Sequence, residues 1–121
     1  MKFELFPFQK TALARLRQSV ATALGNYRST HTPQVVSYTA PTGAGKTIVM
    51  SALIEDIYYG DELYPEQPEA IFIWLSDSPQ LNEQSRLKID LKADKIRLNQ
   101  CVVISDDAFD MEMLEDGHIY F

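Results

Sequence analysis

The sequence predicts an α/β domain in which a parallel sheet is flanked by helices. Residues 70–75 and 101–104 form nearly continuous apolar runs, which are typical of strands buried on both faces. Helical patterns alternate with these runs, and a glycine-rich loop over residues 40–47 opens one of the helices. Because strands and helices alternate, we expect parallel pairing through right-handed crossovers, with a ligand at the carboxyl ends of the strands.

The first expected element is an amphipathic helix that begins at Pro7 and ends at Gly25 and Asn26. Four apolar side chains share one of its faces: Leu13, Leu16, Val20 and Leu24. Residues 34–39 then predict a strand that leads into the glycine-rich loop.

The second helix is expected over about Lys46 to Tyr59, with Gly60 closing it. Its buried candidates are Ile48, Ala52 and Ile57. A third helix is expected to start near Gln80, with its apolar positions at Leu81, Leu87 and Leu91. Residues 119–121 look like the opening of one more strand, so we expect a truncated domain.

Composition restricts the class of protein. A chain of 121 residues with 45% hydrophobic and 23% charged residues is typical of one globular domain. No membrane span or signal peptide is recognisable, and Cys101 is the single cysteine, so we expect a cytoplasmic location without membrane partners. The histidines, His31 and His118, are far apart in sequence and suggest no metal site.

The net charge of −6 argues against a protein that coats nucleic acid. Only residues 86–97 concentrate bases: Arg86, Lys88, Lys92, Lys95 and Arg97. Asp90 and Asp94 interleave with them, so this stretch predicts either a phosphate-facing surface or an ordinary solvated helix face.

The loop APTGAGKT, residues 40–47, has the residue types that bind a triphosphate. Small residues let backbone N–H groups point at phosphate oxygens, Lys46 can reach the β and γ phosphates, and the Thr47 hydroxyl can bind Mg²⁺. The positive end of the following helix acts on the same anion. We therefore expect a nucleoside triphosphate and Mg²⁺ as ligands. The expected nucleotide-binding residues are Pro41, Thr42, Gly43, Ala44, Gly45, Lys46 and Thr47.

Three segments together resemble the first RecA-like domain of superfamily 2 (DEAD/DEAH-type) helicases: LFPFQ at residues 5–9, APTGAGKT, and IFIWLSDSPQLNEQS at residues 71–85. The chain looks most similar to the ATPase (restriction) subunit of type III restriction enzymes. This resemblance implies that residues 1–121 are the N-terminal part of a RecA-like P-loop domain. It also explains Ala40, which stands where the general loop pattern has glycine and which is usual in this family.

The resemblance also implies roles for individual residues. Gln9 matches the glutamine that reads adenine, while Lys46 and Thr47 match the catalytic lysine and the Mg²⁺-binding hydroxyl. A contact with a nucleic-acid backbone is implied for Ser76, Ser78 and Gln84. Ser78 is also a plausible N-cap of the helix that begins around Pro79, and both roles can hold at once. DNA is favoured over RNA by the resemblance alone, and a methyltransferase or specificity subunit is an implied partner.

A clear acidic DExx box, which hydrolysis requires, is missing from this sequence. Asp61 and Glu62 follow a helix rather than a strand, whereas Asp106 and Asp107 follow an expected strand and imitate the box more closely. We expect the box, the second RecA-like domain and any nuclease domain to lie beyond Phe121. This chain alone is therefore expected to bind ATP with weak or absent turnover.

Two other functions compete with a helicase or translocase. A stand-alone nucleotide-binding or regulatory module would need the same loop but no acidic box. A small kinase-like transferase would need an acceptor site and an arginine-rich lid, which the acidic stretch 106–116 does not offer. Tyr38, Phe72 and Trp74 lie in apolar runs and are expected in the core rather than as stacking platforms.

Overall fold

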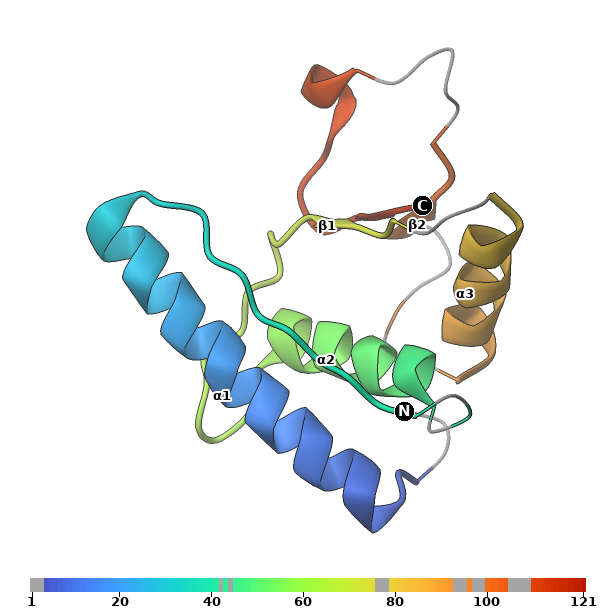
Figure 1. Cartoon of the computed structure of the whole chain (residues 1–121). Coiled ribbons are helices and arrows are strands. Elements are labelled where there is room, and N and C mark those ends of the chain that lie inside the picture. The colour runs from blue at the N-terminus through green and yellow to red at the C-terminus, as the bar shows by residue number, and fades with distance from the viewer. Residues whose placement is uncertain are drawn as a thin grey trace.

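The computed structural model describes residues 4–41, 43, 45–75, 79–92, 96, 100–104 and 110–121. Figure 1 shows the arrangement of the helices and strands. The helices are α1 (Pro7–Thr30), α2 (Lys46–Tyr59), α3 (Pro79–Lys92) and the short 3₁₀ helix η2 (Met111–Met113). The strands are β1 (Phe72–Ile73), β2 (Cys101–Val102) and β3 (Ile119–Tyr120).

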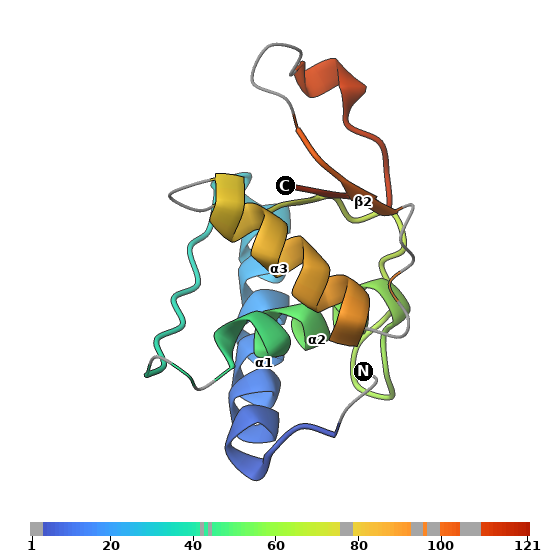
Figure 2. The ribbon, with the colours of Figure 1, turned by 90° about the vertical axis from the view of Figure 1, so that its right-hand side faces the viewer.

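The three strands form one parallel sheet with the order β1-β3-β2. Ile119 of β3 lies opposite Phe72 on one side and Cys101 on the other. The long helices all lie on one side of these strands, and residues 110–118 project on the other side (Figures 1 and 2). The predicted α/β architecture with parallel pairing is confirmed, and it is consistent with part of a RecA-like domain.

Helix α2 packs between two apolar clusters. Toward α1, its cluster consists of Leu16, Val49, Leu53 and Ile57. Toward the sheet and α3, the cluster consists of Ile54, Tyr58, Ile89, Ile96, Ile119 and Phe121. The bounds expected for α2 are confirmed, and Gly60 is its C-cap. Of the expected core side chains, Ala52 and Ile57 are buried and Ile48 is half-buried.

Helix α1 is longer than the sequence pattern indicated. It continues through Gly25 and Asn26 to Thr30, so the expected end at these residues is wrong. His31 ends the helix in the left-handed conformation (φ 55°), with its N–H donating to the carbonyl of Tyr27 at 2.7 Å. One exposed glycine costs a helix only about 1 kcal/mol relative to alanine, which is too little to stop a long helix that packs on a neighbour.

The strand expected over residues 34–39 is absent. Residues 31–41 have no regular secondary structure, and Val35 is 90% exposed. Apolar, β-branched residues favour a strand only where a neighbouring strand can pair with them. No described strand pairs with this segment, so it remains irregular.

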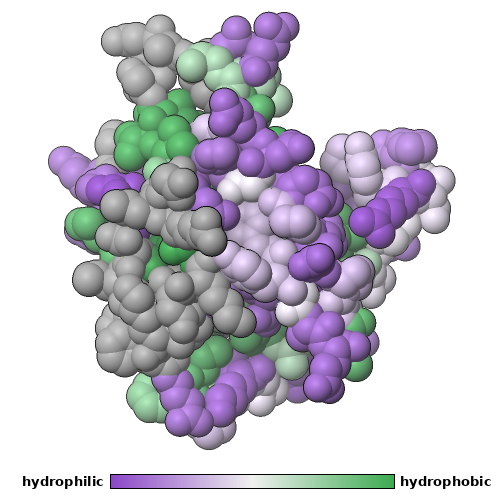
Figure 3. Space-filling view, turned by 180° about the vertical axis from the view of Figure 1, so that it is seen from behind, coloured by the Kyte–Doolittle hydropathy of each residue, from purple (hydrophilic) through white to green (hydrophobic). Residues whose placement is uncertain are grey.

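The strand expected over residues 70–75 is shortened to β1 and is covered on one face only. Phe72 and Trp74 pack toward the core, whereas Ile71, Ile73 and Leu75 are exposed by 40%, 44% and 83%. The expectation of burial on both faces is therefore wrong for this run, because the described helices cover a single face of the sheet. Figure 3 shows the result from behind, where hydrophobic surface forms separate areas among hydrophilic residues.

Helix α3 begins at Pro79, close to its expected start, and meets the core through Ile89, which is fully buried. Leu81 and Leu87 were expected to be its apolar contacts, but both are 45% exposed. The side chain of Leu91 lies outside the described part. In the described ranges, no helix is long and apolar enough to cross a membrane.

Candidate functional site

The glycine-rich loop turns sharply before helix α2. Gly43 (φ +85°) and Gly45 (φ +80°) both have left-handed backbones, which glycine adopts without strain. Gly45 is the N-cap residue of α2, and its carbonyl accepts the Val49 N–H at 3.0 Å. Pro41 precedes the turn and is exposed, whereas Thr42 and Ala44 lie outside the described residues.

Lys46 and Thr47 are the first two residues of α2. Lys46 is exposed and forms no hydrogen bond or ion pair with the rest of the described chain. Thr47 is half-buried, and its carbonyl accepts the Ser51 hydroxyl at 2.6 Å. The first turn of α2 contains no acid and its N-cap provides no side-chain hydrogen bond, so its N–H groups and the helix dipole present a positive end. Such an end binds anions.

Gln9 lies against this loop, although it is distant in sequence. Its side chain is 6% exposed, and a Cβ added at Gly45 would lie 2.5 Å from its Nε2. Its Oε1 accepts the Phe6 N–H at 2.9 Å, which fixes the start of α1. The positive φ favours glycine at position 45, and a side chain there would also displace the Gln9 amide from its place. The structure brings Gln9 together with Gly45, Lys46 and Thr47.

Two phenylalanines beside Gln9 were not singled out from the sequence. Phe6 and Phe8 are 63% and 56% exposed, and their rings stack with centroids 6.0 Å apart. The pattern LFPFQ, with an aromatic residue on each side of Pro7, was the signal available for finding them. They form an exposed aromatic surface at the start of α1.

The residues expected to contact nucleic acid are only partly described. Ser76 and Ser78 lie outside the described residues, and so does any cap that Ser78 provides. Gln84 is exposed on α3. In the same turn, Arg86 Nε donates to Glu83 at 3.1 Å, and this hydrogen bond lowers the pKa of the Glu83 carboxyl. Nearby, the Asn82 side chain donates to the carbonyl of Trp74 at 3.3 Å and ties α3 to the end of β1.

Of the acidic residues that could imitate a DExx box, the structure describes those at 61–62 and not those at 106–107. Asp61 lies in the loop after α2, where its Oδ1 accepts the N–H groups of Leu63 and Tyr64 at 2.8 and 2.9 Å. It therefore shapes a turn, as its position after a helix indicated. Asp106 and Asp107 lie outside the described residues. Among the residues that are described, no three His, Cys, Asp or Glu side chains gather as metal ligands.

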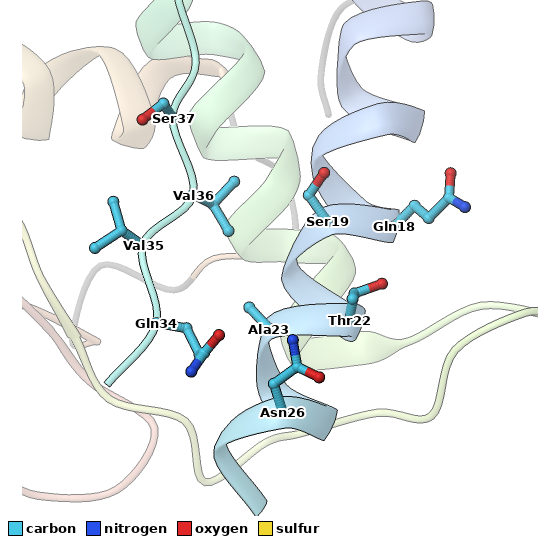
Figure 4. A pocket seen from close by; sticks show the side chains of 9 residues that line it. All are labelled: Gln18, Ser19, Thr22, Ala23, Asn26, Gln34, Val35, Val36 and Ser37. Atoms are coloured by element: carbon cyan, nitrogen blue, oxygen red, sulfur yellow. The ribbon is translucent and has the colours of Figure 1, made fainter. Parts of the chain in front are cut away.

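An open groove of about 480 Å³ lies between the second half of α1 and residues 34–37. Thr22 and Asn26 line it from the helix, and Gln34 and Val36 line it from the irregular segment (Figure 4). Val35 points to the opposite side of the segment. None of the lining residues carries a charge or belongs to the glycine-rich loop, so this groove is separate from the positive end of α2.

Comparison with protein families gives a match over nearly the whole chain. A family model described as type III restriction enzyme, res subunit, matches residues 2–121. Neither the curated proteins nor the solved structures gave a match.

Proposed function

The chain belongs to the family of type III restriction enzyme res subunits, whose model spans residues 2–121, and we propose that it is the ATP-binding part of a DNA helicase or translocase in a restriction-type system. The family itself suggests an ATPase of the helicase type. We further propose that residues 1–121 form the N-terminal part of a RecA-like domain.

The observation that carries this proposal is the contact between Gln9 and Gly45 at the positive end of α2. It joins a side chain suited to a base with a loop suited to phosphates. An amide can donate and accept at the same time, which matches the edge of adenine.

The residues fit ATP and Mg²⁺ in the following way. Backbone N–H groups of the loop after Pro41, including those of Gly43 and Gly45, would surround the phosphates. Lys46 would neutralise the β and γ phosphates, and the Thr47 hydroxyl would bind Mg²⁺. The metal supplies neutralisation of the charge that develops on the phosphates. We assign the catalytic role in this chain to Lys46 and Thr47.

We also propose that Ser76, Ser78 and Gln84 contact a nucleic-acid backbone, with DNA preferred. Hydroxyl and amide groups can hold phosphates without reading sequence. With a net charge of −6, the chain as a whole is suited to a few such contacts rather than to a broad basic surface. A methyltransferase or specificity subunit is the proposed partner.

Replacing Lys46 tests the phosphate-binding assignment. We expect Lys46→Ala to bind a fluorescent ATP analogue roughly 1.5 to 3 kcal/mol more weakly, because a charge-assisted contact is lost. Lys88→Ala, which removes an exposed lysine from α3, is the matched control and should bind like the wild type. Equal affinities for Lys46→Ala and wild type would refute the assignment. We expect little or no ATP turnover by this chain alone.

A further inference from the structure

Arg17 of α1 is a buried cation with an unusual environment. Arg17 is only 3% exposed, and its Nε and Nη2 have no hydrogen-bond partner among the described residues. Its Cζ lies 4.5 Å from the centre of the Tyr64 ring. A buried charge is costly unless something compensates for lost hydration. Stacking on an aromatic face is a contact that a guanidinium makes well, since it is planar and weakly hydrated.

The loop after α2 is built to hold Tyr64 in place. The Asp61 side chain accepts the Tyr64 N–H, and the Asp61 N–H donates to the Tyr64 carbonyl, both at 2.9 Å. Gly60 has φ +67°, and a Cβ there would come within 2.8 Å of the Tyr64 carbonyl. The Gln67 N–H donates to the Ile57 carbonyl at 2.9 Å and returns the loop to the last turn of α2. Tyr64 is thereby fixed to the end of α2.

The last turn of α2 contains no basic residue of its own. The carbonyl end of a helix carries partial negative charge, and a cation near it is stabilised. Arg17 provides a cation from the neighbouring helix, on the ring that this end of α2 holds. The contact therefore joins α1 to α2 through charge and ring orientation as well as through apolar packing.

The position of Arg17 on α1 determines what this contact does. Gln9, Leu13, Leu16 and Val20 lie along one face of the helix, whereas Arg17 lies about 80° around the axis from Gln9 and about 12 Å along it. The apolar packing of α1 on α2 alone would tolerate a small rotation of α1, because apolar contacts are not directional. The Arg17–Tyr64 contact, at the edge of this packed face, limits that rotation.

We infer that Arg17 and Tyr64 form a clasp that sets the rotation of α1 on α2 and so directs Gln9 toward the phosphate loop. In this role they are positioning residues for recognition of the nucleotide base, acting through Gln9. The inference rests on the proposed function, since it assumes that Gln9 faces a bound adenine nucleotide.

The affinities of the full 121-residue chain for fluorescent ATP and GTP analogues test this role. Arg17→Met and Tyr64→Leu should weaken ATP binding about three- to tenfold while changing GTP binding less, because losing the cation–π contact frees α1 to rotate and turns Gln9 away from the base. Tyr64→Phe keeps the ring and should retain the wild-type ATP preference. Arg15→Met removes an exposed arginine from the same helix and should also behave as wild type.

A double-mutant cycle separates positioning from general loss of stability. In a Gln9→Ala background, Arg17→Met should cause no further loss of preference for ATP over GTP, because its effect passes through Gln9. Additive losses would overturn the inference, as would equal nucleotide preference in Arg17→Met, Tyr64→Leu and wild type. Arg17→Lys, which keeps the charge but not the planar group, gives a second variant if Arg17→Met does not fold, and it should lose preference as well.

Failure of the proposed function has a different signature. Wild-type chain that binds neither ATP nor GTP would remove both proposals together. Wild-type chain that binds ATP through Lys46, with a preference that Arg17 and Tyr64 do not affect, would remove the clasp alone.

Discussion

The amide of Gln9 connects two parts of the chain at the scale of a single residue. Its oxygen accepts the Phe6 N–H and fixes the start of α1, while its nitrogen lies against Gly45. The loop residues of the candidate site were recognisable from local sequence, because their glycines, lysine and threonine are consecutive. The contact between Gln9 and Gly45 depends on how α1 packs on α2, so local pattern could not predict it, and only the family resemblance singled out Gln9.

Arg17 is a second residue whose environment local sequence could not predict. An arginine in an amphipathic helix is usually solvated. The helical period places Arg17 at the edge of the apolar face and Arg15 on the opposite side, but it does not reveal that Arg17 is buried. Its burial depends on Tyr64, which reaches it from a loop on another element.

Tyr58 offers a test of stability at one side chain. It is 2% exposed, and its hydroxyl has no hydrogen-bond partner among the described residues. Burial, helped by the nearby Cys101, raises the pKa of this phenol above its ordinary value of 10. Above about pH 10 the unfolded chain therefore releases a proton that the folded chain keeps, and the wild type loses stability as the pH rises.

We expect Tyr58→Phe to be neutral or up to about 1 kcal/mol more stable than wild type near pH 8, because a buried hydroxyl without a partner is removed. The advantage of the variant should grow above about pH 10, by at most about 1.4 kcal/mol per pH unit. Urea unfolding of both proteins at several pH values measures this. A stability difference that stays constant to about pH 11 would contradict the assignment.

At the scale of the elements, helices were predicted better than strands. The ends of α2 follow from Gly45 and Gly60, whose left-handed backbones are local properties. Residues 34–39 and 70–75 have strand composition, but strand formation and burial depend on neighbours that composition does not reveal. The first segment lacks a described partner strand, and the second has helices on one face only.

Helix α1 permits a test of its length. Gly25 lies inside the helix, and a Cβ added there would meet no atom within 4 Å. We expect Gly25→Ala to raise the free energy of unfolding by about 0.5 to 1 kcal/mol, because alanine loses less backbone entropy in a helix. Gly60→Ala is the contrasting variant and should destabilise, since φ is +67° and a Cβ would lie 2.5 Å from the Glu66 nitrogen. Chemical unfolding of the three proteins gives the comparison, and a loss in Gly25→Ala would argue that the helix ends earlier.

At the scale of the whole molecule, α2 links the candidate site to both apolar clusters. Its first residues form the positive end to which we assign the phosphates, and its buried faces contact α1 on one side and the sheet with α3 on the other. Anything that binds at the start of α2 therefore stabilises contacts throughout the described fold.

This arrangement makes overall stability a measure of nucleotide binding. At an ATP·Mg concentration about 100 times the dissociation constant, we expect the free energy of unfolding to rise by roughly 2.7 kcal/mol. Thermal unfolding with and without ATP·Mg should show a higher midpoint for wild type. Lys46→Ala should show a much smaller shift at the same concentration. Identical shifts in both proteins would indicate binding elsewhere.

Residues 31–41 join α1 to α2 without regular structure, and in the described part no backbone hydrogen bond ties residues 32–41 to another segment. What keeps α1 in place is the surface it shares with α2 and Tyr64, to which this segment adds the packing of Tyr38. Most of the docking surface is therefore a property of α1 itself. Supplied as a separate peptide, α1 would still carry the face that places Gln9 beside Gly45, and would lack only the contribution of Tyr38.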